Sequence, residues 1–79
     1  MTLYQFNMLD KIEQAEAVWD GVHIGERLDG EFEILLYHID SFYVEVYYNR
    51  EYNTISKLRS FSSIDQLYPY VRKIDISKL

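Results

Sequence analysis

The sequence predicts an α+β fold with an N-terminal helix, a four-stranded antiparallel meander sheet and a C-terminal helix, both helices lying on one sheet face. Residues 42–48 alternate between two sets of side chains, which is the period of a strand. Asp29-Gly30 and Asp40-Ser41 separate successive strand-like runs, as hairpin turns do. Apolar residues recur at helical spacing near both ends of the chain. We expect residues 1–79 to form a single domain.

The N-terminal helix is predicted by an apolar stripe with steps of four, three and four residues: Met8, Ile12, Ala15 and Trp19. Two starts compete, because Thr2 with Gln5 forms a capping box and Asn7 with Asp10 forms a looser one. The helix should therefore begin near residue 3 or 8, run through Asp20 and end before Gly21. Its apolar stripe should face the core, with Trp19 as an anchor.

Four strands should follow, over Val22–Leu28, Phe32–Ile39, Phe42–Tyr48 and about Asn53–Phe61. The register at Asp29-Gly30 is open between two alternatives. A two-residue turn pairs Glu26 with Glu33, whereas a three-residue loop with Gly30 in a bulge pairs Arg27 with Glu31. The charges favour the bulge.

A two-residue turn at Asp40-Ser41 fixes the central hairpin of the predicted sheet. It pairs Tyr37 with Val44 and Leu35 with Val46 on one face, and His38 with Tyr43 and Ile34 with Tyr47 on the other. The helices should cover the first of these faces. The fourth strand carries Lys57 and Arg59, which suits a sheet edge because charge discourages stray pairing.

The C-terminal helix is predicted by the spacing of Ile64, Leu67, Tyr68, Val71 and Ile74, with Ser63 and Gln66 as a capping box. Pro69 lies too far from this cap to be a first-turn proline. It should interrupt the helix, giving one short turn followed by a helical segment over about residues 69–75.

Composition excludes several kinds of site. The chain has no cysteine, which excludes disulfides and thiolate metal sites. His23 and His38 show neither HxH nor HxxxH spacing, and Glu31 with Glu33 lie beside a turn where solvated acids are common. We expect no catalytic, metal or cofactor site. No signal peptide or membrane span is apparent, which favours the cytoplasm.

The aromatic second face of the sheet is the best candidate for a binding surface. Its predicted residues are Phe32, Ile34, Leu36, Tyr43, Glu45 and Tyr47. If both helices cover the opposite face, these side chains have no cover within the molecule, and such faces commonly meet another protein. We therefore expect a non-enzymatic interaction module that forms a homodimer. A small-molecule or peptide binder is the alternative, and single-stranded nucleic acid is disfavoured by the net charge of −5.

Three segments, residues 36–48, 58–63 and 67–70, resemble a family of small uncharacterised proteins from anaerobic gut bacteria. The runs Phe-Tyr-Val-Glu at residues 42–45 and Ser-Phe-Ser-Ser at residues 60–63 are the most specific parts. The resemblance covers roughly residues 20–76. It implies a compact helix–sheet–helix domain of bacterial origin, without an assigned activity or known binding residues.

Overall fold

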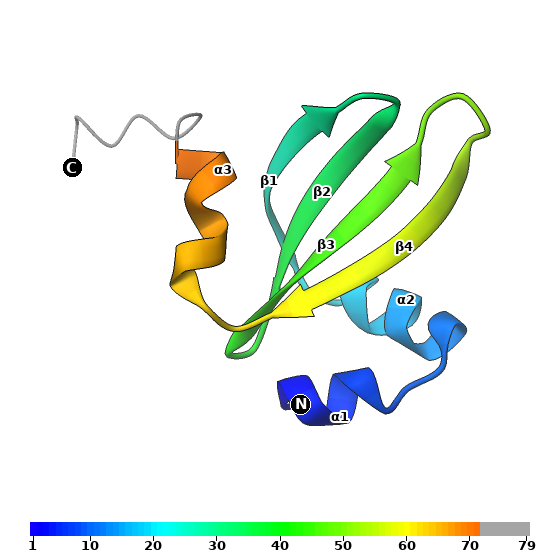
Figure 1. Ribbon diagram of the computed structural model, residues 1–79. Coiled ribbons are helices and arrows are strands. Elements are labelled where there is room, and N and C mark those ends of the chain that lie inside the picture. The colour runs from blue at the N-terminus through cyan, green and yellow to red at the C-terminus, as the bar shows by residue number, and fades with distance from the viewer. Residues whose placement is uncertain (72–79) are drawn as a thin grey trace.

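The computed structural model describes residues 1–71 of the chain and confirms the α+β class (Figure 1). The elements are α1 (Leu3–Asn7), α2 (Lys11–Trp19), β1 (Val22–Asp29), β2 (Phe32–Ile39), β3 (Phe42–Asn49), β4 (Thr54–Phe61), a 3₁₀ turn η1 (Ile64–Leu67) and α3 (Tyr68–Val71). The strands form one antiparallel sheet in the sequential order β1-β2-β3-β4, as the short connections predict.

The N-terminal helix is divided in two. The capping box of Thr2 and Gln5 starts α1, as expected. The second box is made by Asp10 with Glu13 and starts α2, so the expected pairing of Asn7 with Asp10 is wrong. The side chain of Asn7 is used elsewhere, because its Oδ1 accepts a hydrogen bond of 2.6 Å from the hydroxyl of Ser60 on β4.

The apolar stripe of the N-terminal region does not face the core, which corrects the expectation. Met8, Ile12 and Trp19 are 71%, 72% and 53% exposed. Phe6 and Val18 are buried in their place and pack with Phe42 and Val44. The interruption between α1 and α2 lets each helix rotate independently, and packing against the sheet selects the side with Val18.

The central hairpin has the predicted register, with Tyr37 opposite Val44 and Ile34 opposite Tyr47. Asp40 opens its turn at φ 51°. The first hairpin follows neither predicted register, because its turn lies at Gly30-Glu31 and pairs Leu28 with Glu33. Gly30, at φ 60°, supplies the left-handed backbone that such a turn requires. This register places Arg27 opposite Ile34, on the same face as Glu45.

The two faces of the sheet have different covers. We call the face of Leu35, Tyr37, Ile39, Phe42, Val44 and Val46 the helix face, and the face of Phe32, Ile34, Leu36, Tyr43, Glu45 and Tyr47 the aromatic face. α1 and α2 pack on the helix face, as predicted. α3 packs on the opposite face of the sheet from α1 and α2 (Figure 1). There Tyr70 contacts Leu36 and Phe61 of the aromatic face. The prediction that both helices share one face is therefore wrong.

The reason for this placement is the apolar content of the aromatic face. Leu36 and Phe61 need cover from solvent, and the side chains of Tyr70 and Leu67 supply it. Pro69 interrupts the C-terminal helical region as predicted, since η1 gives way to α3 one residue before it. Ser63 precedes η1 but its side chain makes no capping hydrogen bond, so that expectation was wrong. The predicted continuation over residues 72–75 lies outside the described residues.

Candidate interaction surfaces

The predicted interface on the aromatic face divides into a closed half and an open half. Ile34, Leu36 and Glu45 are buried within the single chain, so the expectation that they lack internal cover is wrong. Phe32, Tyr43 and Tyr47 are half-buried. The rings of Phe32 and Tyr47 meet edge to face with centroids 6.0 Å apart. Phe32 and Tyr47 lie near the β1–β2 and β3–β4 turns, whereas Tyr43 lies near the β2–β3 turn at the opposite end of this face.

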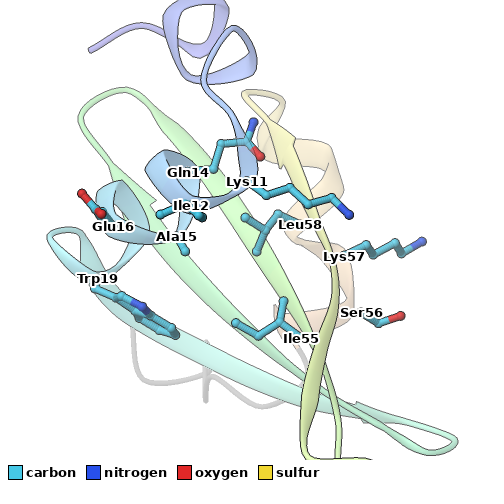
Figure 2. A pocket seen from close by; sticks show the side chains of 10 residues that line it. All are labelled: Lys11, Ile12, Gln14, Ala15, Glu16, Trp19, Ile55, Ser56, Lys57 and Leu58. Atoms are coloured by element: carbon cyan, nitrogen blue, oxygen red, sulfur yellow. The ribbon is translucent and has the colours of Figure 1, made fainter.

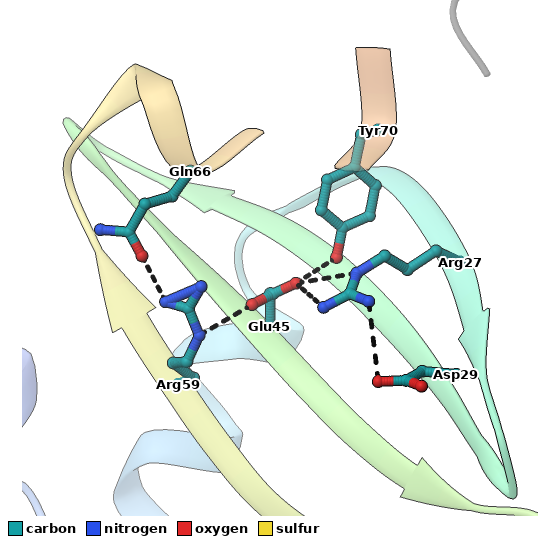
Figure 3. Close-up of polar contacts among 6 residues, drawn as sticks. All are labelled: Arg27, Asp29, Glu45, Arg59, Gln66 and Tyr70. Atoms are coloured by element: carbon teal, nitrogen blue, oxygen red, sulfur yellow. Dashed lines mark hydrogen bonds and ion pairs between the residues drawn. The ribbon is translucent and has the colours of Figure 1, made fainter. Parts of the chain in front are cut away.

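The closed half is organised around the carboxylate of Glu45, which is 1% exposed (Figure 3). Oε2 accepts hydrogen bonds from Arg27 Nη2 at 3.2 Å and from the Tyr70 hydroxyl at 2.6 Å. Oε1 lies 3.1 Å from Arg59 Nε, an ion pair whose geometry is not that of a directed hydrogen bond. Glu45 thus forms a cross-strand ion pair with Arg59 on β4. Arg27 on β1 and Tyr70 on α3 add further partners to the same carboxylate.

Two further contacts extend this network outward. Arg59 Nη1 donates to the side-chain oxygen of Gln66 on η1, and Arg27 Nη1 lies 4.0 Å from Asp29 Oδ2. β1, β3, β4 and the C-terminal segment thus all contribute to one polar cluster (Figure 3). A buried carboxylate is tolerated here because two guanidinium groups and a phenol compensate for its lost hydration.

The phenol of Tyr70 is fixed between apolar and charged groups. An added Cβ on Gly25 would lie 3.3 Å from the Tyr70 ring, so the glycine leaves room for that ring. The guanidinium of Arg27 lies 5.7 Å from the ring centroid. Burial raises the pKa of the Tyr70 hydroxyl well above its usual range, and the hydrogen bond to Glu45 and its negative charge raise it further. The nearby Arg27 opposes this shift.

A second surface lies on the helix face, between α2 and β4. The exposed stripe of α2 forms one wall of a groove of about 450 Å³, and residues 55–58 of β4 form the other (Figure 2). Ile12, Ala15 and Trp19 line the first wall, facing Ile55 and Leu58 (Figure 2). Lys11 lies at one side of the groove and Glu16 at the other (Figure 2). Lys57 borders the groove with its backbone strand, but its ammonium lies over Tyr47 on the aromatic face. The sequence placed this stripe in the core and therefore did not predict the groove.

The remaining candidate groups form no further site. His23 and His38 contact Tyr37 and Tyr43 on opposite sheet faces, with ring centroids 5.3 and 4.8 Å apart. Within residues 1–71, no three His, Asp or Glu side chains are grouped closely enough to hold a metal ion. Lys57 Nζ lies 4.4 Å from the Tyr47 ring centroid, so a base and an aromatic ring do adjoin as nucleic-acid binders require.

None of the helices in residues 1–71 has both the length and the apolar character needed to span a membrane. Comparisons with protein-family models, curated proteins and solved structures found no match for this chain. The resemblance to small proteins of gut bacteria stays a prediction.

Proposed function

We propose that this protein is a small non-enzymatic interaction module that forms a homodimer through the groove between α2 and β4. The observation that carries the proposal is the exposed apolar stripe of α2. Ile12 and Trp19 lie two turns apart on the same face of α2. Both border Ile55 of β4, which is 43% exposed. A contiguous apolar patch with a polar rim is typical of protein interfaces.

The charges around the groove are self-complementary. Glu16 lies toward one side of the groove, whereas Lys11 lies toward the other (Figure 2). A two-fold axis running parallel to α2 brings the acidic flank of each copy opposite the basic flank of the other. Such pairing favours a second copy of this chain over an unrelated apolar partner.

The available area fits a weak dimer. An aromatic side chain presents about 150–250 Å², and just over half of Trp19 is exposed, so this residue alone offers about 100 Å². The three apolar side chains with their charged rim reach the lower size range of specific interfaces, below about 1,200 Å² in total. We therefore expect a dissociation constant in the micromolar range. A cytoplasmic location belongs to the same proposal and is supported by the absence of cysteine from the sequence.

Sedimentation velocity and light scattering test the interface. Wild type should be dimeric at about 100 μM, and Trp19→Glu should be monomeric because it places a charge in the apolar patch. Ile64→Glu is the matched control, since Ile64 is 75% exposed but lies on η1, away from the groove. Tyr47→Glu should also stay dimeric, because Tyr47 lies on the aromatic face. A monomeric wild type, or a dimeric Trp19→Glu protein, would refute the proposal.

A charge exchange tests the symmetry. Lys11→Glu and Glu16→Lys should each weaken the homodimer, because each opposes like charges across the two-fold axis. The double variant should recover dimerisation, and a mixture of the two single variants should form heterodimers. Additive weakening in the double variant would exclude this arrangement.

A further inference from the structure

Tyr70 occupies a slot on the aromatic face that is built for a phenol. The floor of the slot is formed by Leu36 and by the bare backbone of Gly25, where a side chain would crowd the ring. Glu45 lies at its end and accepts a hydrogen bond of 2.6 Å from the Tyr70 hydroxyl. Arg27 borders the ring and neutralises the carboxylate. An apolar floor, a glycine and a paired acceptor together select a tyrosine over a phenylalanine.

The segment that supplies this tyrosine is held on the sheet by side-chain contacts. Gln66 accepts from Arg59, Leu67 is half-buried in the apolar cluster and Tyr70 fills the slot. Ile64 and Pro69 are exposed. A 3₁₀ turn followed by a four-residue helix has little stability of its own, so the position of the segment depends on side-chain contacts, and these three are among them. Local opening of such a segment costs less free energy than global unfolding.

The charged part of the surface beneath the segment tolerates exposure better than the apolar part around Leu36 and Phe61 does. Opening returns the charges of Glu45, Arg27 and Arg59 to water, and their recovered hydration offsets part of the lost contact. Arg59 is already 39% exposed. The uncovered patch therefore keeps a specific hydrogen-bond acceptor, Glu45, and its charged groups are hydrated when the segment is open. A contact that is always buried requires neither property.

We propose that this slot is a binding site for a tyrosine presented by a partner protein, and that residues 64–71 are its intramolecular competitor. The contacts of residues 64–71 define the expected ligand. It has a tyrosine that donates to Glu45, as Tyr70 does, and four residues earlier a side chain that accepts from Arg59, as Gln66 does. A partner segment with the same two features displaces Tyr70 and takes the place of residues 64–71 on the aromatic face. This inference is independent of the groove between α2 and β4.

The test uses the whole chain with Tyr70→Ala and a fluorescently labelled peptide with the sequence of residues 64–71. Anisotropy should show binding to this variant below about 1 mM. The peptide carrying phenylalanine in place of Tyr70 should bind about ten-fold more weakly, because it lacks the charge-assisted hydrogen bond. Wild type should bind the tyrosine peptide at least about ten-fold more weakly than the variant, because its own tyrosine competes.

Tyr70→Phe provides a second variant that keeps the ring in place, and it should bind the tyrosine peptide more tightly than wild type does. A folded Tyr70→Ala protein that binds neither peptide would overturn the proposal. Equal affinity for the two peptides, or equal binding by wild type and both variants, would overturn it as well. Loss of the wild-type dimer in Tyr70→Ala would assign the slot to the tyrosine of a second copy instead of a different partner.

Discussion

At the scale of single residues, Glu45 has the greatest structural consequence. It lies in the middle of a strand whose other residues are aromatic or aliphatic except for Asn49 at the end, and burying its charge alone would be costly. The cost is offset by Arg27 from one edge strand, Arg59 from the other and Tyr70 from α3. One carboxylate thereby links four segments that are distant in sequence. Its removal leaves two arginines without their partner, which destabilises more than the loss of a surface charge.

The hydrogen bond between Tyr70 and Glu45 makes the stability pH-dependent in the alkaline range. The pKa of Tyr70 is raised in the folded state, first by burial and then by Glu45, whereas the unfolded chain has a tyrosine pKa of about 10. Below about pH 10 both states keep the proton and the contribution is fully present. Above it the unfolded state loses its proton first, so the free energy of unfolding falls as pH rises.

The measurement is urea denaturation of wild type and Tyr70→Phe between about pH 8 and 11.5. The stability advantage of wild type should shrink above about pH 10, by up to about 1.4 kcal/mol per pH unit. The seven other tyrosines are common to both proteins and cancel in the difference. A difference that stays constant over this range would contradict the assigned role of the hydroxyl.

At the scale of elements, α2 depends on its N-terminal cap. It is short, and its exposed stripe contributes little burial within the monomer. The capping box of Asp10 and Glu13 satisfies two of the backbone N–H groups that a helix start leaves unpaired. Val18 then fixes the rotation of the helix on the sheet. The cap sets where α2 begins, and packing sets which side it buries.

Asp10→Ala should therefore lower the free energy of unfolding by about 1 kcal/mol. Asp10→Asn should stay within about 0.5 kcal/mol of wild type, because asparagine is an equally good N-cap. Chemical denaturation measures both, and far-ultraviolet circular dichroism reports any loss of helix. Equal destabilisation by alanine and asparagine would indicate that the negative charge of Asp10, and not its capping geometry, is what stabilises α2.

At the scale of the whole molecule, the sheet is covered on both faces by short segments that do not span it. α1 and α2 cover the end of the helix face near Ile39 and Phe42, and α3 covers the part of the aromatic face around Leu36. Each face therefore has a buried part and an accessible part. The accessible parts are the groove beside α2 and the surface around Tyr47, and they determine how the molecule meets others.

The adjacent residues Val18 and Trp19 of α2 point to different environments, the core and the exposed groove. Val18→Ala should lower the free energy of unfolding by about 1–3 kcal/mol, because it leaves a cavity beneath the helix. Trp19→Ala should lower it by less in the monomer, because just over half of that residue is exposed and its removal leaves no enclosed cavity. Urea denaturation at protein concentrations well below 1 μM avoids a contribution from dimerisation. The reverse order of the two effects would place the stripe of Trp19 in the core.

Local pattern was enough to determine the elements and the meander. The alternation of residues 42–48, the turn at Asp40-Ser41 and the cap at Thr2 each depend on neighbours within a few positions, and all three were predicted from sequence. The fold class and the central register follow from them, because hairpin connections this short leave few alternatives.

Tertiary structure decided the rotation of α2, the side on which α3 lies, the turn at Gly30-Glu31 and the partners of Glu45. Each of these chooses between arrangements that satisfy the same local pattern. Trp19 and Val18 are both acceptable core residues, and only contact with the sheet distinguishes them. The guanidinium of Arg27 can form an ion pair with an acid on the next strand or with Glu45 two strands away. The second pairing is selected because it neutralises a buried charge, an energy that no local window of sequence contains.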